Sequence, residues 1–241
     1  MLDMGFLPAV RDLVARTPKT RQTLLFSATF APELQQLARQ ILNAPQRVEV
    51  GLTAPPQTVA HTLCPVEASQ KTALLLQLLG EARQGSVLVF TRTKHRADRL
   101  ARQVEQSGHR AAVLHSNRSQ GQRQAALESF RSGKVKLLVA TDIAARGLDI
   151  AGISHVINYD MPDTPDAYIH RIGRTGRAAC SGDAWTLVTA DDKPAVRDLE
   201  RVLGEPIAVR KVGDHDYGLP TFAPTSGGRS SGSGGRSTMT S

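Results

Sequence analysis

The stretch VKLLVATDIAARGLDI, residues 135–150, decides the fold of the chain because it joins an apolar run to a polar loop. Its apolar residues are continuous and do not alternate with polar ones. Continuous apolar runs are typical of strands in a parallel sheet that is covered on both faces. Thr141 and Asp142 follow at the point where the loops of parallel sheets gather ligands. The stretch therefore predicts a buried parallel strand with polar chemistry at its carboxyl end.

Similar apolar runs recur along the chain, and amphipathic helical patterns separate them. The predicted strands cover residues 61–67, 86–91, 111–116, 135–141, 155–160 and 184–189. Ser69 precedes the first helix, which we expect to end at Gly80, and Thr93 opens the second. Ser119 and Gln122 form a capping box at the start of the third. This alternation favours a right-handed parallel α/β domain with helices on both faces of the sheet.

The first part of the chain, residues 1–50, breaks this pattern. Its sequence predicts a helix over 6–16, a strand over 21–28 and a second helix over 31–42. One strand is too little to make a sheet of its own. We therefore expect residues 1–50 to be separate from the α/β domain.

The remaining boundaries follow from composition. A linker that contains Pro55 and Pro56 covers residues 51–60, and the α/β domain is expected to span 61–205. Residues 206–241 form a basic tail whose end is rich in Gly and Ser. Such a composition cannot bury a core, so residues 206–241 are predicted to be a disordered tail.

Overall composition narrows the partners of the chain. Its formal net charge of +8 and isoelectric point near 10.0 favour a polyanion, because Lys and Arg gain by displacing the counterions of phosphates. Only 4% of the residues are aromatic, which argues against a platform that stacks bases. Cys64 and Cys180 belong to no CxxC pair and are interpreted as reduced structural thiols. No secretion signal and no apolar run of about 18 residues is found, so we expect a cytoplasmic protein.

The segment HRIGRTGR, residues 170–177, crowds positive charge around two glycines and one isoleucine. A solvated basic loop is one interpretation. The other is an anion site, because Arg174 and Arg177 would share one face if the segment is helical. Two guanidinium groups on one face could converge on a phosphoryl group, as arginine fingers do. The isoleucine and the glycines favour the anion site.

Polar loops also follow three predicted strands, at residues 91–96, 115–123 and 141–150. With HRIGRTGR they are expected to line one edge of the sheet, where N–H groups, glycines and arginines can hold phosphates. Carboxylates repel phosphate, so Asp149 is interpreted as a ribose acceptor or an arginine partner, with helix capping as the alternative. Asp142 is interpreted as a helix N-cap.

The chain has arginines for a triphosphate but no phosphate cradle of its own. No G-x-x-x-x-G-K-[ST] motif occurs in the printed sequence. The fragment SGKVK, residues 132–136, comes nearest, but Val135 stands where a hydroxyl residue is needed.

Six segments resemble, in order and spacing, the later motifs of DEAD-box ATP-dependent RNA helicases. They are SAT (27–29), VLVFTRTK (87–94), LHSNRSQGQR (114–123), VATDIAARGLDI (139–150), VINYDMP (156–162) and HRIGRTGR (170–177). The likeness covers residues 1 to about 205. MLDMGF, LLFSATF, FTRTKH and ATDIAARGLDI look most like the bacterial RhlE-type branch.

The resemblance implies two RecA-like domains that close together on ATP and single-stranded RNA. Residues 61–205 would be the second domain, and residues 1–50 an incomplete remnant of the first. Mg²⁺ would accompany ATP, with its ligands upstream of this sequence and no metal ligand in this chain. RNA would be contacted through its backbone, without readout of the bases.

The resemblance also implies roles for residues at the nucleotide. Arg174 and Arg177 would be arginine fingers on the γ-phosphate, and His170 would link the nucleotide site to the coupling network. Asp149 would hold the ribose. Arg146 would tie the nucleotide site to the RNA site.

Further roles concern RNA and coupling. Ser27 and Thr29 would couple the nucleotide state to unwinding. The residues implied to touch the RNA backbone are Gln120, Arg123, Thr141 and Gly147. Ser116 departs from the family, which usually has glycine there, and could tilt the neighbouring RNA contact.

In the family, MLDMGF follows directly after the D-E-A-D box, so the phosphate-binding lysine, the magnesium carboxylates and the adenine-reading segment would lie upstream. We expect the C-terminal part of an ATP-dependent RNA helicase, and no ATP hydrolysis by the isolated chain. The alternative is a stand-alone module that binds RNA or pairs with an intact helicase. A DNA-translocating relative would share the arginine fingers, but TDIAARGLDI and VLVFTRTK favour RNA.

Overall fold

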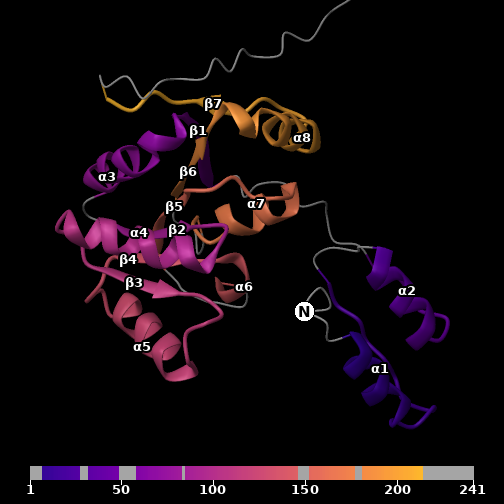
Figure 1. The fold of residues 1–241 in the computed structure, drawn as a ribbon. Coiled ribbons are helices and arrows are strands. Elements are labelled where there is room, and N and C mark those ends of the chain that lie inside the picture. Colours follow the sequence, from indigo (N-terminus) through magenta and orange to yellow (C-terminus); the bar gives the residue numbers. More distant parts are fainter. Residues whose placement is uncertain are drawn as a thin grey trace, which may run out of the picture. The chain divides into compact units, whose positions relative to one another are not determined.

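The computed structural model describes residues 7–27, 32–48, 58–82, 85–145, 152–176 and 181–213 (Figure 1). The chain divides into two compact units, Met1–Leu52 (unit 1) and Thr53–Ser241 (unit 2). Unit 2 holds the sheet and most of the buried residues.

Unit 1 contains two helices, α1 (Leu7–Ala15) and α2 (Pro32–Ile41), close to the bounds that the sequence predicts. The predicted strand over 21–28 is wrong for the described residues 21–27, which have no regular structure. A strand needs a neighbour to bond its N–H and C=O groups, and the described part of unit 1 offers none. Leu24 and Phe26 are accordingly 69% and 88% exposed.

Unit 2 is built on a seven-stranded sheet in which all neighbouring strands are parallel. The strands are β1 (Val59–Pro65), β2 (Ser86–Phe90), β3 (Ala111–Leu114), β4 (Leu137–Ala140), β5 (Ile153–Asn158), β6 (Gly182–Val188) and β7 (Ala208–Val209). Their order across the sheet is β3-β4-β2-β5-β6-β1-β7. The first six confirm the six predicted strands. The sequence does not predict β7, because its two exposed residues carry no apolar pattern. The predicted disordered tail is therefore wrong at its start, where β7 pairs with β1 and Ile207 and Val212 are buried.

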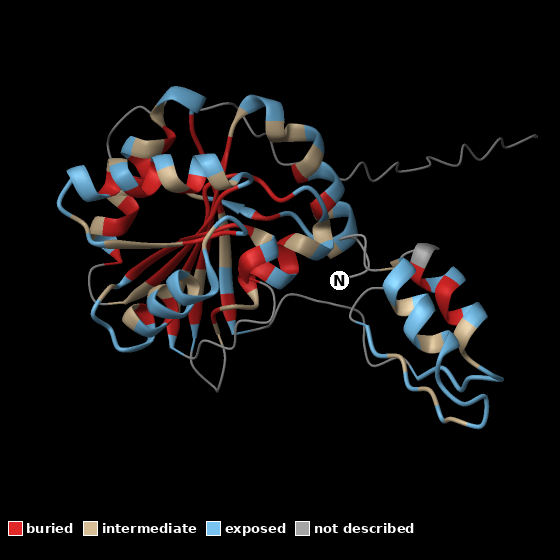
Figure 2. Cartoon of the chain, turned by 60° about the horizontal axis from the view of Figure 1, so that its bottom comes forward, coloured by how far each residue is buried: buried red, intermediate tan, exposed pale blue. Residues whose placement is uncertain are grey.

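Helices cover both faces of this sheet, as the continuous apolar runs predict (Figure 1). They are α3 (Lys71–Glu81), α4 (Lys94–Gln106), α5 (Gln120–Arg131), α6 (Asp142–Ala145), α7 (Pro165–Ile172) and α8 (Lys193–Leu203), with short 3-10 helices η2 (Ala68–Gln70) and η3 (Ala190–Asp192). One buried cluster lies under α5, α6, α7 and α8, and another under α3 and α4. Figure 2 shows the strands buried between helices whose outer faces are exposed.

Local hydrogen bonds explain where the helices begin. The Thr93 hydroxyl accepts from the backbone N–H of Arg96 (3.2 Å), and the capping box of Ser119 and Gln122 is present in both directions. The prediction for the first helix is partly wrong. Gly80 lies inside the last turn of α3, because it has an ordinary helical backbone there, and the helix continues to Glu81.

Of the two cysteines and the C-terminal tail, the structure describes Cys64 and the tail up to residue 213. Cys64 is buried and forms no disulfide, and burial raises the pKa of its thiol to about 12, as expected for an unreactive side chain. Cys180 and the tail after residue 213 lie outside the described residues. Within the described ranges, no helix is long and apolar enough to cross a membrane.

Candidate functional site

The carboxyl ends of β3, β4, β2 and β5 meet along one edge of the sheet, called here the carboxyl edge, because these four parallel strands are neighbours. The loops after β3 and β4 are joined directly. The Thr141 N–H donates to the carbonyl of Leu114 (3.2 Å), and the Thr141 carbonyl accepts from Ala145 (3.0 Å). Thr141 is therefore buried at the start of α6, beside the loop that leads into α5.

Three of the four residues implied to contact RNA lie where these two loops meet the helices that follow them. Gln120 is the first residue of α5 and Arg123 lies in its first turn, next to the loop that Thr141 adjoins. Gly147 lies outside the described residues. The capping box at Ser119 fixes the direction in which α5 leaves the edge.

The loop after β3 is also anchored to α4. Lys94 Nζ donates to Asn117 Oδ1 (3.0 Å), and Arg118 pairs with Asp98 (2.8 Å). Nε2 of the buried His115 lies 3.0 Å from the same Asp98 carboxylate. Burial alone would raise the pKa of Asp98, but His115 and Arg118 outweigh it and hold that pKa below its ordinary value. These contacts give the edge a fixed shape without a ligand.

Arg171 in the last turn of α7 makes the densest set of contacts at the carboxyl edge. Its Nε and Nη2 atoms each donate to the Asp142 carboxylate at 2.6 Å, and its Nη1 donates to Asn158 Oδ1 (3.2 Å) and to the Asp160 carbonyl (2.8 Å). The guanidinium also lies 5.1 Å from the centre of the Phe90 ring. Arg171 is only 3% exposed, so its charge is stable there because these acceptors replace water.

The interpretation of Asp142 as an N-cap is therefore wrong. Asp142 is the first residue of α6, and both oxygens of its carboxylate are taken by Arg171. A planar guanidinium offers two parallel donors, which bind a carboxylate better than a single backbone N–H does.

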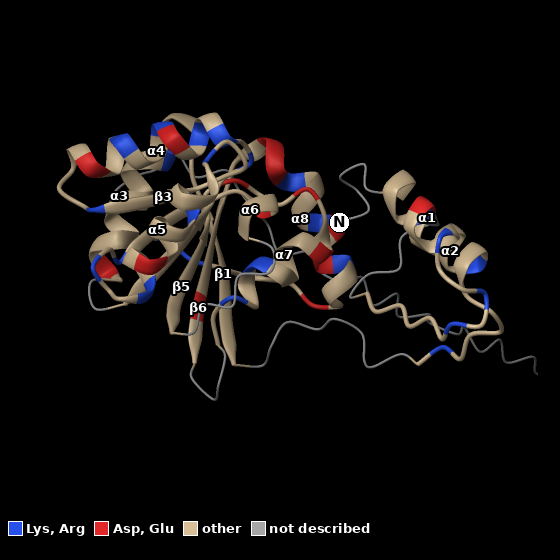
Figure 3. Cartoon of the chain, turned by 90° about the horizontal axis from the view of Figure 1, so that it is seen from below, with Lys and Arg blue, Asp and Glu red and all other residues tan. Residues whose placement is uncertain are grey.

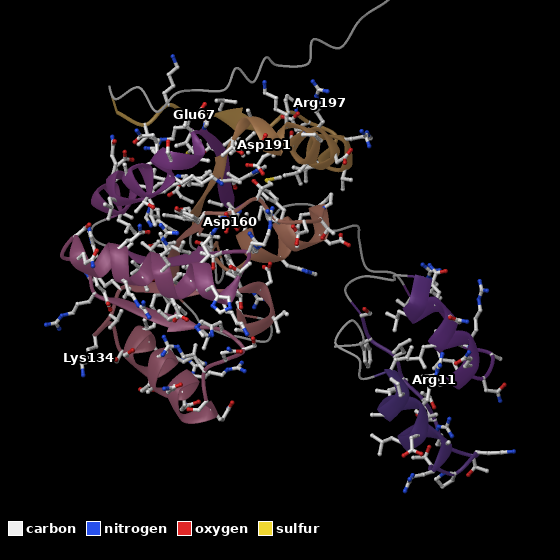
Figure 4. All side chains as sticks on the ribbon, viewed as in Figure 1. Arg11, Glu67, Lys134, Asp160, Asp191 and Arg197 are labelled. Carbon is white, nitrogen blue, oxygen red and sulfur yellow. The ribbon has the colours of Figure 1, made fainter. Side chains whose placement is uncertain are left out.

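Asp160 extends these contacts across the edge and is labelled in Figure 4. Its carboxylate accepts from the Arg92 N–H (2.9 Å) and pairs with Arg96, and its carbonyl holds Arg171. Lys71 Nζ lies 3.9 Å from the same carboxylate and donates to the Tyr159 carbonyl (3.0 Å). The residues Arg171, Asp142, Asn158, Asp160, Arg96 and Lys71 are called here the Arg171 network.

Lys71 shows how much this region is screened from water. Burial lowers the pKa of its ammonium group, although Asp192 and Asp160 oppose the shift. A cavity of about 420 Å³ opens beside it, between α3 and α4. Figure 3 shows that the positions of basic and acidic residues are interspersed along the ribbon of α4, so this side of the edge is not uniformly basic.

The segment HRIGRTGR does not follow the predicted path throughout. Its isoleucine, Ile172, is fully buried, but α7 ends there and residues 173–176 form turns. The Thr175 hydroxyl donates to the carbonyl of Ile153 (2.6 Å), at the amino end of β5. The Thr58 hydroxyl donates to the carbonyl of Gly176 (2.7 Å) next to the start of β1. The prediction that the whole segment lies at the carboxyl edge is wrong, because the chain runs from Arg171 along the face of the sheet toward its other edge.

The structure describes some of the implied nucleotide and coupling residues and not others. His170 is exposed in the last turn of α7, and Arg174 is half-buried two residues beyond the helix. Ser27 belongs to unit 1 and is exposed. The residues that lie outside the described ranges are Thr29, Arg146, Asp149 and Arg177.

Sequence reasoning missed Arg171 and Asp160, which hold the edge together. Arg171 is the one arginine of HRIGRTGR to which no role is assigned. Asp160 follows directly after a strand, in the same kind of position that draws attention to Asp142. That position is the signal that could have found it.

Comparisons with known proteins agree with the fold and the motifs. The family described as "Helicase conserved C-terminal domain" matches residues 70–179. The chain is 40% identical over 249 residues to DEAD-box ATP-dependent RNA helicase 30 of Arabidopsis thaliana, covering 97% of this chain and 42% of that protein. It is 44% identical over 211 residues to RNA helicase CrhR of Synechocystis sp., covering 87% of this chain and 43% of that protein. The chain spans about half the length of the curated relatives it matches.

Solved structures give the same result. The E. coli DEAD-box protein SrmB, in a crystal with the regulator RraA, is 39% identical with a TM-score of 0.61, covering 64% of this chain and 91% of that chain. S. cerevisiae Dbp5, bound to RNA and ADP BeF3, is 30% identical with a TM-score of 0.77, covering 85% of this chain and 54% of that chain. These similarities confirm the RecA-like fold. The chain therefore belongs to the DEAD-box RNA helicase family and corresponds to its C-terminal part, with residues 70–179 as the conserved helicase domain.

Proposed function

We propose that this chain is the C-terminal half of an enzyme that remodels RNA by binding and hydrolysing ATP. The bidentate bond between Arg171 and Asp142 carries the proposal. It joins HRIGRTGR, which would meet the γ-phosphate, to TDIAARGLDI, which would meet the ribose and the RNA. A guanidinium held by two charge-assisted bonds moves together with its carboxylate. A displacement at the phosphate would thus be passed to the RNA contacts.

At the nucleotide, we propose that Arg174 and Arg177 place guanidinium groups on the γ-phosphate, where negative charge develops during transfer. His170 would connect this site to the coupling residues. Asp149 would accept from the ribose hydroxyls, and Arg146 would lie between the nucleotide and the RNA.

For RNA, the proposed contacts are to phosphates and 2′-hydroxyls and are independent of sequence. Ser27 and Thr29 of unit 1 would report the nucleotide state, and unit 1 would be a remnant of the first RecA-like domain. The proposed backbone contacts are Gln120, Arg123, Thr141 and Gly147.

The chemistry of the side chains suits ATP but not its metal ion. The described residues include no group of three or more His, Cys, Asp or Glu side chains that could hold a metal. We propose that Mg²⁺ is bound by the half that carries the phosphate cradle. Bound ATP would supply the phosphoanhydride that breaks, and this chain would supply guanidinium groups to the departing phosphoryl group.

The test is to measure RNA-stimulated ATP hydrolysis by this chain alone and by the chain joined to a first RecA-like domain with its P-loop and D-E-A-D box. We expect no turnover by the chain alone and clear turnover by the joined protein. Arg174→Ala should lower that turnover by about 10³-fold or more, and Arg174→Lys should not restore it, because lysine lacks the forked donors. Turnover by the isolated chain, or a joined enzyme indifferent to Arg174→Ala, would contradict the proposal.

A second candidate is a stand-alone module that binds RNA or pairs with an intact helicase. It is favoured by the completeness of unit 2, whose sheet is covered on both faces by two buried clusters. Binding of RNA by the purified chain, measured at several salt concentrations, tests it. A chain with no detectable affinity at low ionic strength is not such a module.

Two finer assignments are also proposals. MLDMGF, LLFSATF, FTRTKH and ATDIAARGLDI support the RhlE-type branch. The cytoplasmic location is the second proposal. Placing the chain in a tree of DEAD-box proteins tests the branch, and cell fractionation tests the compartment.

A further inference from the structure

A second group of basic residues lies at the opposite end of the strands, called here the amino edge. The loops that lead into β3, β4 and β2 enclose a cavity of about 310 Å³ there. Its floor is apolar, with Leu79, Val87 and Leu137. Its rim is basic. The cations of the rim are Arg110, Lys134 and Lys136, called here the amino-edge cluster.

The register of the sheet brings two of these cations side by side. Ala111 of β3 is aligned with Leu137 of β4, so the preceding residues, Arg110 and Lys136, enter the sheet at neighbouring positions. Neighbouring strands are roughly 4.8 Å apart. Like charges at adjacent positions of a sheet repel each other. Lys136 is fixed in place, because its carbonyl accepts from the Val87 N–H (2.8 Å).

No acidic side chain of the described residues pairs with this cluster. None of the described residues that line the cavity is acidic, and the three cations form no ion pair with described residues. The nearby helix α3 ends in Glu81, but that carboxylate pairs with Arg210. All three cations are exposed, and Figure 4 shows Lys134 pointing away from the ribbon.

The ends of helices offer another reason for cations here. The C-termini of α4 and α5 lie just before the loops that carry Arg110 and Lys134, and cations near helix C-termini are favourable. That role would be structural. It would appear in the stability of the domain and not in the binding of a ligand, so the two explanations can be separated by measurement.

We propose that the amino-edge cluster binds phosphates of RNA, as a second RNA contact in addition to the one at the carboxyl edge. Three cations without an ion-pair partner among the described residues, on the two adjacent loops that lead into β3 and β4, match a chain of phosphates. Among the described residues that line the cavity, the imidazole of His109 is the one aromatic ring, so we expect a contact that does not stack bases and is independent of sequence. Strands of four to five residues separate the two edges by about 15 Å, which one RNA molecule can span.

The inference takes RNA as the partner from the proposed function but does not depend on ATP hydrolysis. It also names one kind of polyanion. An acidic protein segment would be attracted by the same charges and is treated as a contrary outcome of the test.

The experiment uses the full chain and a single-stranded homopolymer RNA long enough to reach both edges. Arg110→Gln, Lys134→Gln and Lys136→Gln are combined in one variant. The matched control combines Arg102→Gln, Arg197→Gln and Lys211→Gln, three exposed cations that lie on α4, on α8 and after β7. Both variants lose three charges, but only the first loses the cluster.

The slope of log K against log salt concentration is the main measurement. Each phosphate contact with a single strand contributes about 0.7 to that slope, so the cluster variant should lose roughly 2. Its affinity at low salt should fall at least about tenfold more than that of the control. Equal losses in both variants would mean general attraction to a basic protein and would overturn the proposal. So would an unchanged affinity for RNA with a lost affinity for poly-glutamate.

A third variant separates this inference from the proposed function. Arg123→Gln removes a proposed contact at the carboxyl edge. If Arg123→Gln weakens RNA binding and the cluster variant does not, the amino-edge contact is refuted and the proposed function stands. If only the cluster variant weakens binding, the amino-edge contact stands and the proposed role of Arg123 fails. A parent chain that binds no RNA at low salt would refute both.

Discussion

The two edges of the sheet in unit 2 use charge in opposite ways. At the carboxyl edge, Arg171 and Asp160 are at most 3% exposed, and each is held by several partners. At the amino edge, Arg110 and Lys136 are exposed and unpaired with the described chain, and they lie next to each other. Buried charges need partners inside the protein, whereas exposed charges are solvated and can pair with a ligand.

This difference separates stability from binding. Removing a member of the Arg171 network leaves a buried polar group without its partner, which costs free energy of folding. Removing an exposed lysine leaves nothing unsatisfied, and any loss appears only when a partner is present. Substitutions at the carboxyl edge should therefore change the free energy of unfolding more than substitutions at the amino edge do, and unfolding experiments can measure the difference.

The largest effect is expected for Arg171→Met. Methionine fills much of the same space but leaves the Asp142 carboxylate, Asn158 and the Asp160 carbonyl without their donor. The Asp142 carboxylate is 36% exposed and can regain water, so we expect a loss of about 3 kcal/mol, at the lower end of the cost of breaking a buried ion pair. Denaturant unfolding followed by circular dichroism measures the change in the free energy of unfolding.

Arg201→Met is the matched control. Arg201 pairs with Asp198 one turn away on α8, but its side chain is 75% exposed. Exposed pairs contribute about 0.2–1 kcal/mol. Equal losses for Arg171→Met and Arg201→Met would show that burial does not distinguish the two pairs.

A smaller loss is expected for Asp160→Asn. The shape of the side chain is kept and the backbone carbonyl still accepts from Arg171, but the charge that faces Arg96 and Lys71 is removed. Hydrogen bonds to charged groups contribute about 1.5–3 kcal/mol, and we expect a loss in that range. Asp163→Asn is the control, because Asp163 pairs with Arg92 at the surface. A loss for Asp163→Asn as large as for Asp160→Asn would contradict the assignment.

The sequence predicts most elements of unit 2 well, because most of its strands are continuous buried runs and because α4 and α5 begin at capping residues. Thr93 and Ser119 act through bonds between residues three apart, which a sequence pattern can reveal. The strand predicted over 21–28 fails for the opposite reason. A strand depends on neighbours, and its own residues do not show whether those neighbours exist.

The site is predicted less completely than the fold. The resemblance finds the segments, but it does not reveal that Arg171 and Asp142 meet across 29 positions of the chain. The sequence alone does not show which acidic residue pairs with Arg171. That pairing depends on the strand order, which places β4 and β5 on either side of β2. The prediction for residues 173–176 is wrong because packing decides whether a helix continues past Ile172. The Thr175 hydroxyl instead donates to the carbonyl of Ile153 in β5.

Lowering the pH tests the stability of the domain without substituting any residue of the arginine pairs. Burial lowers the pKa of His61, with Glu205 opposing, and lowers the pKa of His155, with Asp183 opposing. A histidine with a lowered folded pKa binds protons more weakly in the folded chain, so stability falls as the pH drops through the ordinary value of 6.5. We expect a lower unfolding midpoint at pH 5.5 than at pH 7.5.

The double substitution His61→Asn and His155→Asn should flatten this dependence. The lowered pKa of Asp98 acts in the same direction but only near its ordinary value of 3.8, which lies below the range tested. A pH dependence that persists in the double variant would place its origin outside these two histidines.

The smallest effect is expected for Lys136→Gln, and its sign decides what the amino-edge cluster is for. If Lys136 mainly stabilises helix ends, its loss should lower the free energy of unfolding by about 0.3–1 kcal/mol. If repulsion from Arg110 dominates, the loss should raise that free energy by a few tenths of a kcal/mol, because like charges at adjacent sheet positions destabilise by about 0.2–1 kcal/mol. We expect the rise, since Lys136 follows Gly133 by three residues and lies beyond the last turn of α5.

Unfolding midpoints of the parent chain and of Lys136→Gln, in low salt and in 1 M salt, measure this change in stability. The difference should vanish at high salt, where the Debye length is about 3 Å. A loss of stability in low salt would mean that Lys136 stabilises the folded domain. A gain would mean that Arg110 and Lys136 repel each other in the folded domain, and that a bound anion is what would make this pair of cations favourable.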